Sequence, residues 1–235
     1  MNKISNEEHF ALLDELEISY NLIIKGLKEI QNFNDYDKFY FLPLQLLSQG
    51  IERFLKSYFC LYYFMENNSF PKIDTLRSFS HDINQPIKLI LEKYFKSYDR
   101  EQYKLDLAFI NHNQNLKEFL NILSYFGSGK GRYYNFNIIT GNKTQNNYVI
   151  EQFKIFENTL MKQNNLYLEM FDEKHNQVVN EFVIKEIVKI VEKFVCAISR
   201  QFIFNNYNFE LTPFVLNNFL SFGMMHEGDF GKNKY

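Results

Sequence analysis

The stretch that decides the fold runs from Leu46 to Asp82 and reads LLSQGIERFLKSYFCLYYFMENNSFPKIDTLRSFSHD. Its first half is apolar and aromatic at helical spacing, yet Glu52, Arg53 and Lys56 stand in the middle of it. A buried charge without a partner is costly, so charges on such a helix need a reason to be there. The stretch therefore predicts a helix packed within a bundle, with a few ionic groups sheltered among its neighbours.

The rest of the chain predicts long helices and few turns. Only 9 glycines and 4 prolines occur among 235 residues. Ser5 and Glu8 form a capping box that opens a helix reaching about Ile30. The spacing of apolar residues predicts further helices over about residues 43–65, 82–98, 99–126, 147–171 and 176–205, with a short one after Pro213. Gly50, inside the second helix, indicates close packing of another helix, because glycine there costs about 1 kcal/mol relative to alanine.

Three segments are not predicted to be helical. Residues 67–79 contain Pro71 and read as a loop, and residues 132–140 read as an extended segment or short hairpin. Residues 223–235 read as a flexible tail. The fold expected is thus one all-α domain over residues 1–222, with a bundle core over about 10–171 and additional C-terminal helices over 174–222.

Composition limits the classes of function. The net charge of −2 argues against a surface coated with positive charge for general nucleic-acid binding, although it leaves room for a local basic groove. Cys60 and Cys196 lie far apart in apolar patterns, which indicates buried, inert thiols rather than a disulfide framework or a metal site. The chain starts without an apolar run and has no apolar stretch of about 18 residues, so we expect a cytoplasmic protein with no membrane contact.

The ionic groups of the opening stretch are the main candidates for chemistry. Glu52 and Lys56 are four residues apart, which suits either an exposed helical ion pair or a pair that lines a groove. His81 stands between Ser80 and Asp82 at a predicted helix start. It could contact a phosphate there, pair with Glu52 across the bundle, or serve only as part of a capping turn.

This combination of an E-R-x-x-K helix with a later S-H-D resembles the HEPN group of small α-helical bundles, which occur in prokaryotic toxin–antitoxin and phage-defence systems. The resemblance implies a homodimer that acts on RNA. HEPN ribonucleases carry an Arg and a His separated by four to six residues near the start of a late helix. The Arg neutralises the scissile phosphate and the His moves a proton.

That signature is incomplete in this chain. Arg132 stands where the arginine is expected, but Asn137 stands where the histidine would be, and asparagine cannot act as a general base near pH 7. Arg77 and His81 are separated by one residue too few and precede an early helix. The resemblance therefore implies Arg132 and His81 as catalytic residues of an enzyme, with Glu52, Lys56, Lys130 and Asn137 as binding residues.

Other motifs carry less information. The stretch Gly127–Gly131 with Lys130 suits a helix end followed by a turn, or a basic loop that touches phosphate; it lacks the pattern of a P-loop. His112 lies on an apolar stripe, which indicates a core histidine. His9, His175 and His226 lack the spacing of metal ligands, so no metal or other cofactor is predicted.

Two functions follow as hypotheses. The first is a metal-independent ribonuclease, or RNA-binding protein, of prokaryotic defence or toxin–antitoxin type, with a cognate antitoxin or defence protein as partner. The second is a non-catalytic HEPN module that binds a partner protein or a nucleotide. A purely structural helical scaffold without a ligand is a third reading.

Overall fold

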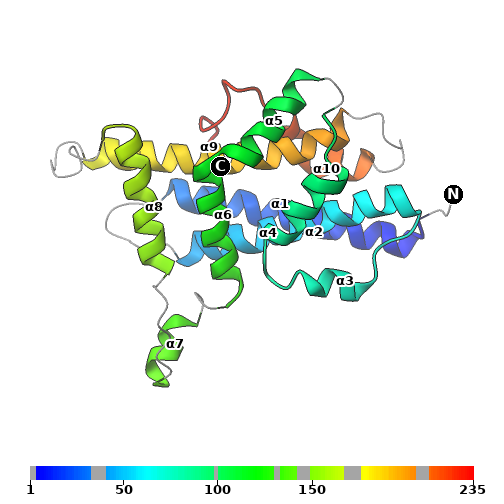
Figure 1. Ribbon diagram of the computed structural model, residues 1–235, viewed down its shortest axis with the longest axis horizontal. Coiled ribbons are helices and arrows are strands. Elements are labelled where there is room, and N and C mark those ends of the chain that lie inside the picture. Colours follow the sequence, from blue (N-terminus) through cyan, green and yellow to red (C-terminus); the bar gives the residue numbers. More distant parts are fainter. Residues whose placement is uncertain are drawn as a thin grey trace.

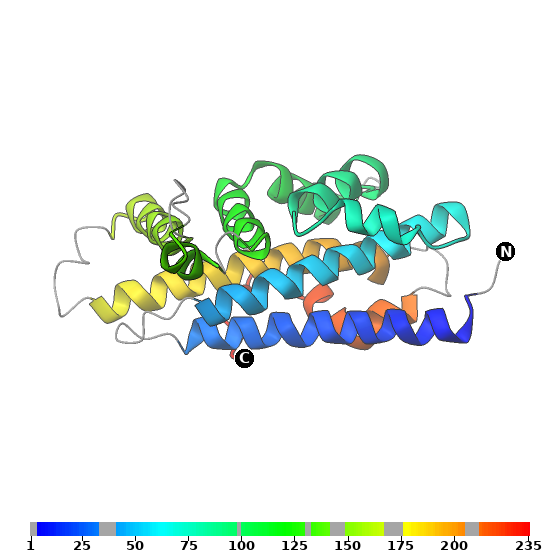
Figure 2. The same ribbon diagram turned by 90° about the horizontal axis from the view of Figure 1, so that it is seen from below.

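The computed structural model describes residues 4–32, 41–97, 100–129, 133–141, 149–166, 176–204 and 212–235. Every regular element in these ranges is a helix, so the all-α prediction is confirmed. The helices form two layers: long helices that lie along the molecule, and shorter ones that cross them (Figures 1 and 2).

The helices α1 (Asn6–Gln31) and α2 (Phe41–Asn67) form the most extensive contact of the long layer. They run antiparallel side by side, as Figure 2 shows. A β-carbon on Gly26 would lie 2.7 Å from the Leu47 side chain, and one on Gly50 would lie 3.0 Å from the backbone nitrogen of Ile23. Each helix thus uses a glycine to let the other approach, which confirms the expectation at Gly50.

The long helix α9 (Asn176–Ile203) completes this layer, and α10 (Thr212–Gly223) packs on both α9 and α1. Aromatic rings from α2, α9 and α10 interleave inside the chain. The Phe54 ring lies 4.9 Å from the Phe219 ring, and the Tyr58 ring lies 5.3 Å from that of Phe202. Many of the chain's large aromatic side chains are therefore used in its own core.

The crossing layer consists of shorter helices that lie on one side of α2 and α9 (Figure 2). They are α4 (Asn84–Leu89), the π-helix η1 (Ile90–Tyr94), α5 (Glu101–His112), α6 (Gln114–Gly127) and α8 (Val149–Gln163). The helix α6 packs on α2 and α8, and α5 packs on α9. This layer holds the turn around His81 against α2.

The predicted helix over residues 99–126 is wrong as a single element. It breaks at Asn113, whose side chain accepts a hydrogen bond from the Leu116 backbone N–H at 2.8 Å and caps α6. The break changes which face of α5 is buried: Tyr103, Asp106 and Ile110 point inward, and His112 is exposed. The expectation of a core histidine is therefore wrong.

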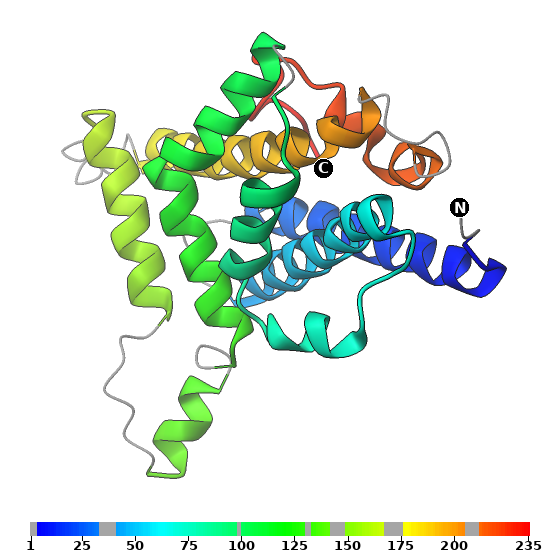
Figure 3. The same ribbon diagram turned by 45° about the vertical axis from the view of Figure 1, so that its right-hand side comes forward.

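Two of the three segments that were not expected to be helical contain a helix. The loop over residues 67–79 contains α3 (Ile73–Ser78), and the segment expected to be extended near 132–140 contains α7 (Tyr134–Ile139). The helix α7 projects from the body of the molecule (Figure 3) and exposes Phe136, Ile138 and Ile139. Asn135 and Asn137 disfavour a strand, and a run of six residues is too short for periodicity to decide between the two.

The segment after α10 is not the free tail that its composition predicts. Buried Glu192 on α9 accepts hydrogen bonds from the Gly231 backbone N–H, the Asn233 amide and the Tyr235 hydroxyl. The Gln31 side chain bonds the backbone of residues 233 and 235. The returning segment thereby buries Glu192 completely.

None of the helices in the described ranges combines the length and the apolar character needed to cross a bilayer.

Candidate functional site

A groove lies between α1, α2, α3 and the turn that carries His81. Its volume is about 590 Å³. Charged and apolar side chains both line it, which is the character of a ligand site rather than of a packing defect. Its polar lining comprises Glu15, Gln49, Glu52, Arg53, Lys56, Ser57, Arg77 and His81, and its remaining lining comprises Leu12, Cys60, Ile73, Leu76 and Gly127.

Glu52 is the centre of the ionic cluster in this groove. One carboxylate oxygen lies 2.7 Å from Lys56 Nζ, and the other lies 3.0 Å from His81 Nδ1. The Glu52 side chain is 15% exposed, whereas that of His81 is 50% exposed. The carboxylate is thus held inside the wall, and the imidazole stands at the surface of the groove.

The turn that carries His81 is fixed from two sides. Lys56 Nζ donates a second hydrogen bond to the Ser80 carbonyl at 2.7 Å. On the other side, the Ser124 hydroxyl donates to the Asp82 carboxylate at 3.1 Å and accepts from the Ile83 backbone N–H at 3.2 Å. Helices α2 and α6 therefore set the position of the imidazole.

The contact with Glu52 also sets the proton arrangement of the imidazole. An ionised carboxylate can only accept a hydrogen bond, so Nδ1 is the donor. In the neutral ring, Nε2 then carries the lone pair and can accept a proton. A carboxylate that orients a histidine in this way also stabilises the imidazolium that forms. The pair is suited to general acid–base chemistry.

Two arginines add positive charge to the groove. Arg53 Nη1 lies 2.6 and 2.8 Å from the two carboxylate oxygens of Glu15 on α1. Arg77 on α3 makes only a loose contact of 3.7 Å with Asp74, and its side chain is 74% exposed. Arg77 is therefore the more available of the two for an anionic ligand.

Cys60 lines the same groove without the character of a nucleophile. Burial, together with the nearby Glu15 carboxylate, raises the pKa of the Cys60 thiol to about 12. A thiol with this pKa stays protonated near neutral pH, and the reactive form is the thiolate.

The structure brings together three of the residues that the sequence singled out, namely Glu52, Lys56 and His81. Lys130 and Arg132 lie outside the described residues. Asn137 lies half-buried on α7 and is not part of the groove lining. Sequence reasoning did not select Glu15 or Arg77 as site residues, because a charge on a predicted surface helix or loop gives no signal of what it faces.

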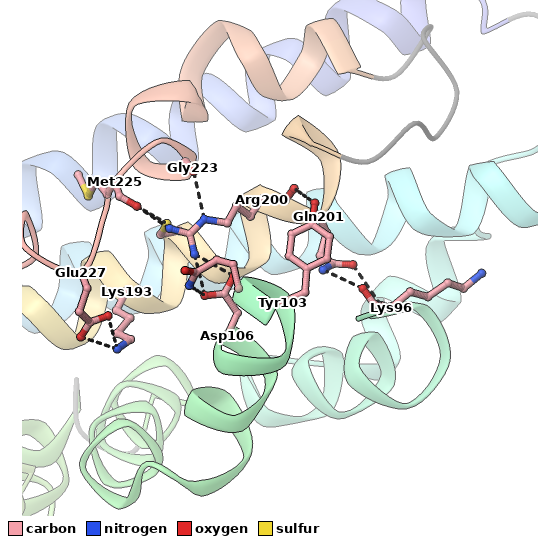
Figure 4. A network of polar contacts seen from close by, with 11 residues as sticks. Lys96, Tyr103, Asp106, Lys193, Arg200, Gln201, Gly223, Met225 and Glu227 are labelled. Atoms are coloured by element: carbon pink, nitrogen blue, oxygen red, sulfur yellow. Dashed lines mark hydrogen bonds and ion pairs between the residues drawn. The ribbon is translucent and has the colours of Figure 1, made fainter. Parts of the chain in front are cut away.

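A second ionic cluster, which the sequence did not indicate, lies between α5 and α9 (Figure 4). Arg200 Nη1 lies 2.7 and 2.9 Å from the two Asp106 carboxylate oxygens, and the guanidinium also donates to the carbonyls of Gly223 and Met225. The Arg200 and Asp106 side chains are 7% and 2% exposed. All of these partners are internal, so the cluster joins α5, α9 and the segment after α10.

The fold and the groove define an all-α bundle with an ionic, histidine-bearing groove. The sequence profiles of known protein families give no match to this chain, and neither a curated protein nor a solved structure matches it. The HEPN resemblance therefore stays a prediction from the residues quoted above.

Proposed function

We propose that this chain is a HEPN-like protein of prokaryotic defence or toxin–antitoxin type that binds RNA in the groove and cleaves it without a metal ion. The observation that carries the proposal is the contact of 3.0 Å between His81 Nδ1 and Glu52 in a groove that also holds Arg53 and Arg77. Proton transfer and phosphate binding need these groups at one place.

In the proposed reaction, His81 Nε2 takes the proton of a ribose 2′-hydroxyl. The 2′-oxygen forms a bond to the adjacent phosphorus while the bond to the 5′-oxygen breaks, and the leaving 5′-oxygen takes a proton from water. Glu52 stabilises the imidazolium, and an arginine offsets the charge on the phosphate. Arg132 is the phosphate contact that the resemblance implies, and Arg77 and Arg53 are the arginines that line the groove.

The test is cleavage of a labelled single-stranded RNA by the purified chain in the presence of EDTA. His81→Ala should lower the cleavage rate by about 100-fold or more, because general acid–base catalysis contributes about 10²–10⁴-fold. Arg132→Ala should also lower the rate strongly. His112→Ala, which removes an exposed histidine outside the groove, is the matched control and should leave the rate unchanged.

Persistent cleavage by His81→Ala would reject His81 as the proton carrier. Persistent cleavage by Arg132→Ala would reject the role that the resemblance gives to that arginine. Cleavage that stops with EDTA would reject the metal-independent reaction.

A second candidate function is a non-catalytic module that binds RNA, a nucleotide or a partner protein. Two observations favour it: Asn137 stands where the family has its histidine, and among the described residues the groove contains a single histidine, His81. A chain that binds RNA without cleaving it, and whose expression does not arrest growth, would select this function over the ribonuclease.

The proposal includes a homodimer in the cytoplasm and a cognate antitoxin or defence protein as a further partner. The exposed Phe136, Ile138 and Ile139 of α7 support an interface there, because a helix of six residues is not stable by itself and these apolar side chains face solvent. Light scattering should give the mass of a dimer at micromolar concentration, and a monomer would contradict this part of the proposal.

A further inference from the structure

The helix α3 forms one wall of the groove, yet it is held loosely. It is only six residues long, and none of its residues is buried. Leu76 is its one side chain that packs against the core, while Ile73 is 57% exposed. A helix with so few apolar contacts opens at little cost in free energy.

The two ends of α3 are anchored much more firmly than the helix itself. Before it, the Phe70 ring lies 4.9 Å from the Phe64 ring of α2, and after it the buried Phe79 ring lies 5.1 Å from the Phe59 ring. The segment between these two aromatic anchors can therefore move without releasing either end. This arrangement is that of a lid with fixed hinges.

Backbone strain marks both flanks of the lid. Asn68 has φ of 49° and Ser80 has φ of 48°, in the left-handed region that non-glycine residues seldom adopt. Asparagine tolerates this conformation, but serine adopts it at a cost of about 1 kcal/mol. The Ser80 carbonyl is the group that Lys56 holds, and the next residue is His81.

The side chains that α3 brings to the groove suit a nucleotide unit. Ile73 and Leu76 give an apolar surface, and Leu12 of α1 also lines the groove. An apolar surface of this kind can cover a nucleobase. Among the described residues, the Arg77 guanidinium has only the loose ion pair with Asp74, and a guanidinium can bind a phosphate through two hydrogen bonds.

We propose that α3 is a lid that closes over one nucleotide unit, with Arg77 paired to its phosphate and Ile73 and Leu76 against its base. This inference rests on the proposed function, because it assumes that the groove takes RNA. A single-stranded RNA and a free mononucleotide both offer the phosphate and the base that the lid would contact. The experiment therefore includes both ligands.

The first measurement is hydrogen exchange of the full chain without ligand. The amides of residues 73–78 should exchange at least 100-fold faster than those in the middle of α2, because α3 opens locally. Addition of a saturating single-stranded RNA of eight nucleotides should slow exchange in this segment at least fivefold. Protection of α3 equal to that of α2 in the free chain would overturn the lid.

The second measurement is affinity by fluorescence anisotropy with the same RNA. Arg77→Gln should weaken binding about 10-fold and should reduce the slope of log K against log salt by about 0.7, the value for one phosphate contact on a single strand. Lys88→Gln is the matched control, since Lys88 on α4 is 76% exposed, makes an ion pair of similar length (3.8 Å) and lies outside the groove. Its affinity should stay within twofold of the parent, and Arg77→Lys should recover at least half of the loss in binding free energy.

The two ligands and the variants at Arg77 and Lys88 separate the possible failures. RNA binding that Arg77→Gln and Lys88→Gln weaken equally would overturn the role of Arg77 while the proposed function stands. Competition by adenosine monophosphate at micromolar concentration would assign the lid to a free nucleotide rather than to an RNA strand. Absence of binding to both ligands would overturn this inference together with the proposed function.

Discussion

Two ionic clusters among the described residues have opposite surroundings. In the cluster of α5 and α9, Arg200 and Asp106 are almost fully buried, and the partners of Arg200 among the described residues are all internal oxygens. In the groove, Glu52 is mostly buried, but His81 is half-exposed and Arg77 is 74% exposed. A charge that is fully paired inside a protein holds the fold, whereas a charge that keeps solvent access can exchange its partner for a ligand.

The largest expected effect is the loss in free energy of unfolding when the arginine of each cluster is replaced. Arg200→Met should lower the free energy of unfolding by about 3–5 kcal/mol, because it leaves the Asp106 carboxylate buried without its cation. Arg53→Met, the matched change in the groove, should lower it by about 1 kcal/mol or less, since the Arg53–Glu15 pair is exposed. Urea denaturation of both variants measures the difference. Equal losses in the free energy of unfolding would contradict the view that the α9 cluster stabilises the fold more than the groove cluster does.

A smaller loss of stability is expected at Lys56, which is the residue of the groove cluster that holds the His81 turn in place. Lys56→Met should lower the free energy of unfolding by about 1–2 kcal/mol, because the Ser80 carbonyl and the Glu52 carboxylate each lose a charged donor. It should also raise hydrogen exchange around residue 81. Unchanged stability and exchange would mean that α6 alone fixes the His81 turn.

Each cluster also has one cysteine beside it. The rate at which a reagent labels each thiol measures how accessible that cluster is to solvent, and this measurement needs no destabilising substitution. Burial raises the pKa of both Cys60 and Cys196 to about 12. The rate of labelling by a thiol-specific disulfide reagent should therefore rise about tenfold for each pH unit between 7 and 11, as the thiolate fraction rises. Cys60, which lines the groove, should react before Cys196, which is fully buried beside Arg200.

The variant Cys60→Ser identifies the faster thiol in this measurement. Loss of the slower phase in that variant would contradict the assignment and would place solvent access at the α9 cluster instead.

Much of the fold could be predicted because helices are local. The capping box at Ser5 is present, with both of its hydrogen bonds, and the apolar period of residues 176–205 becomes the long helix α9. The break at Asn113 was not predicted, because the apolar residues on its two sides continue one apparent stripe. The side chain of Asn113 caps a new helix there, although the apolar spacing continues across it.

The candidate site could be predicted only in part. Charges inside an apolar helix indicated Glu52 and Lys56, and the helix-start position indicated His81, since these signals are local in the sequence. Arg77 and Glu15 gave no such signal, because their roles depend on which elements face α2. Asp106 also looked like an ordinary surface residue, and its partner Arg200 lies 94 residues further along the chain.

By itself, the sequence determined that this protein is helical, where most of its helices lie, and that ionic groups must be sheltered near the middle of α2. Periodicity and capping act over a few residues, so they can be read from the chain. The tertiary structure alone decided that Glu52 meets His81 in an open groove, that Asp106 meets Arg200 in a closed core, and that residues 224–235 return to bury Glu192. These pairings depend on the summed packing of distant apolar faces, which no local pattern encodes.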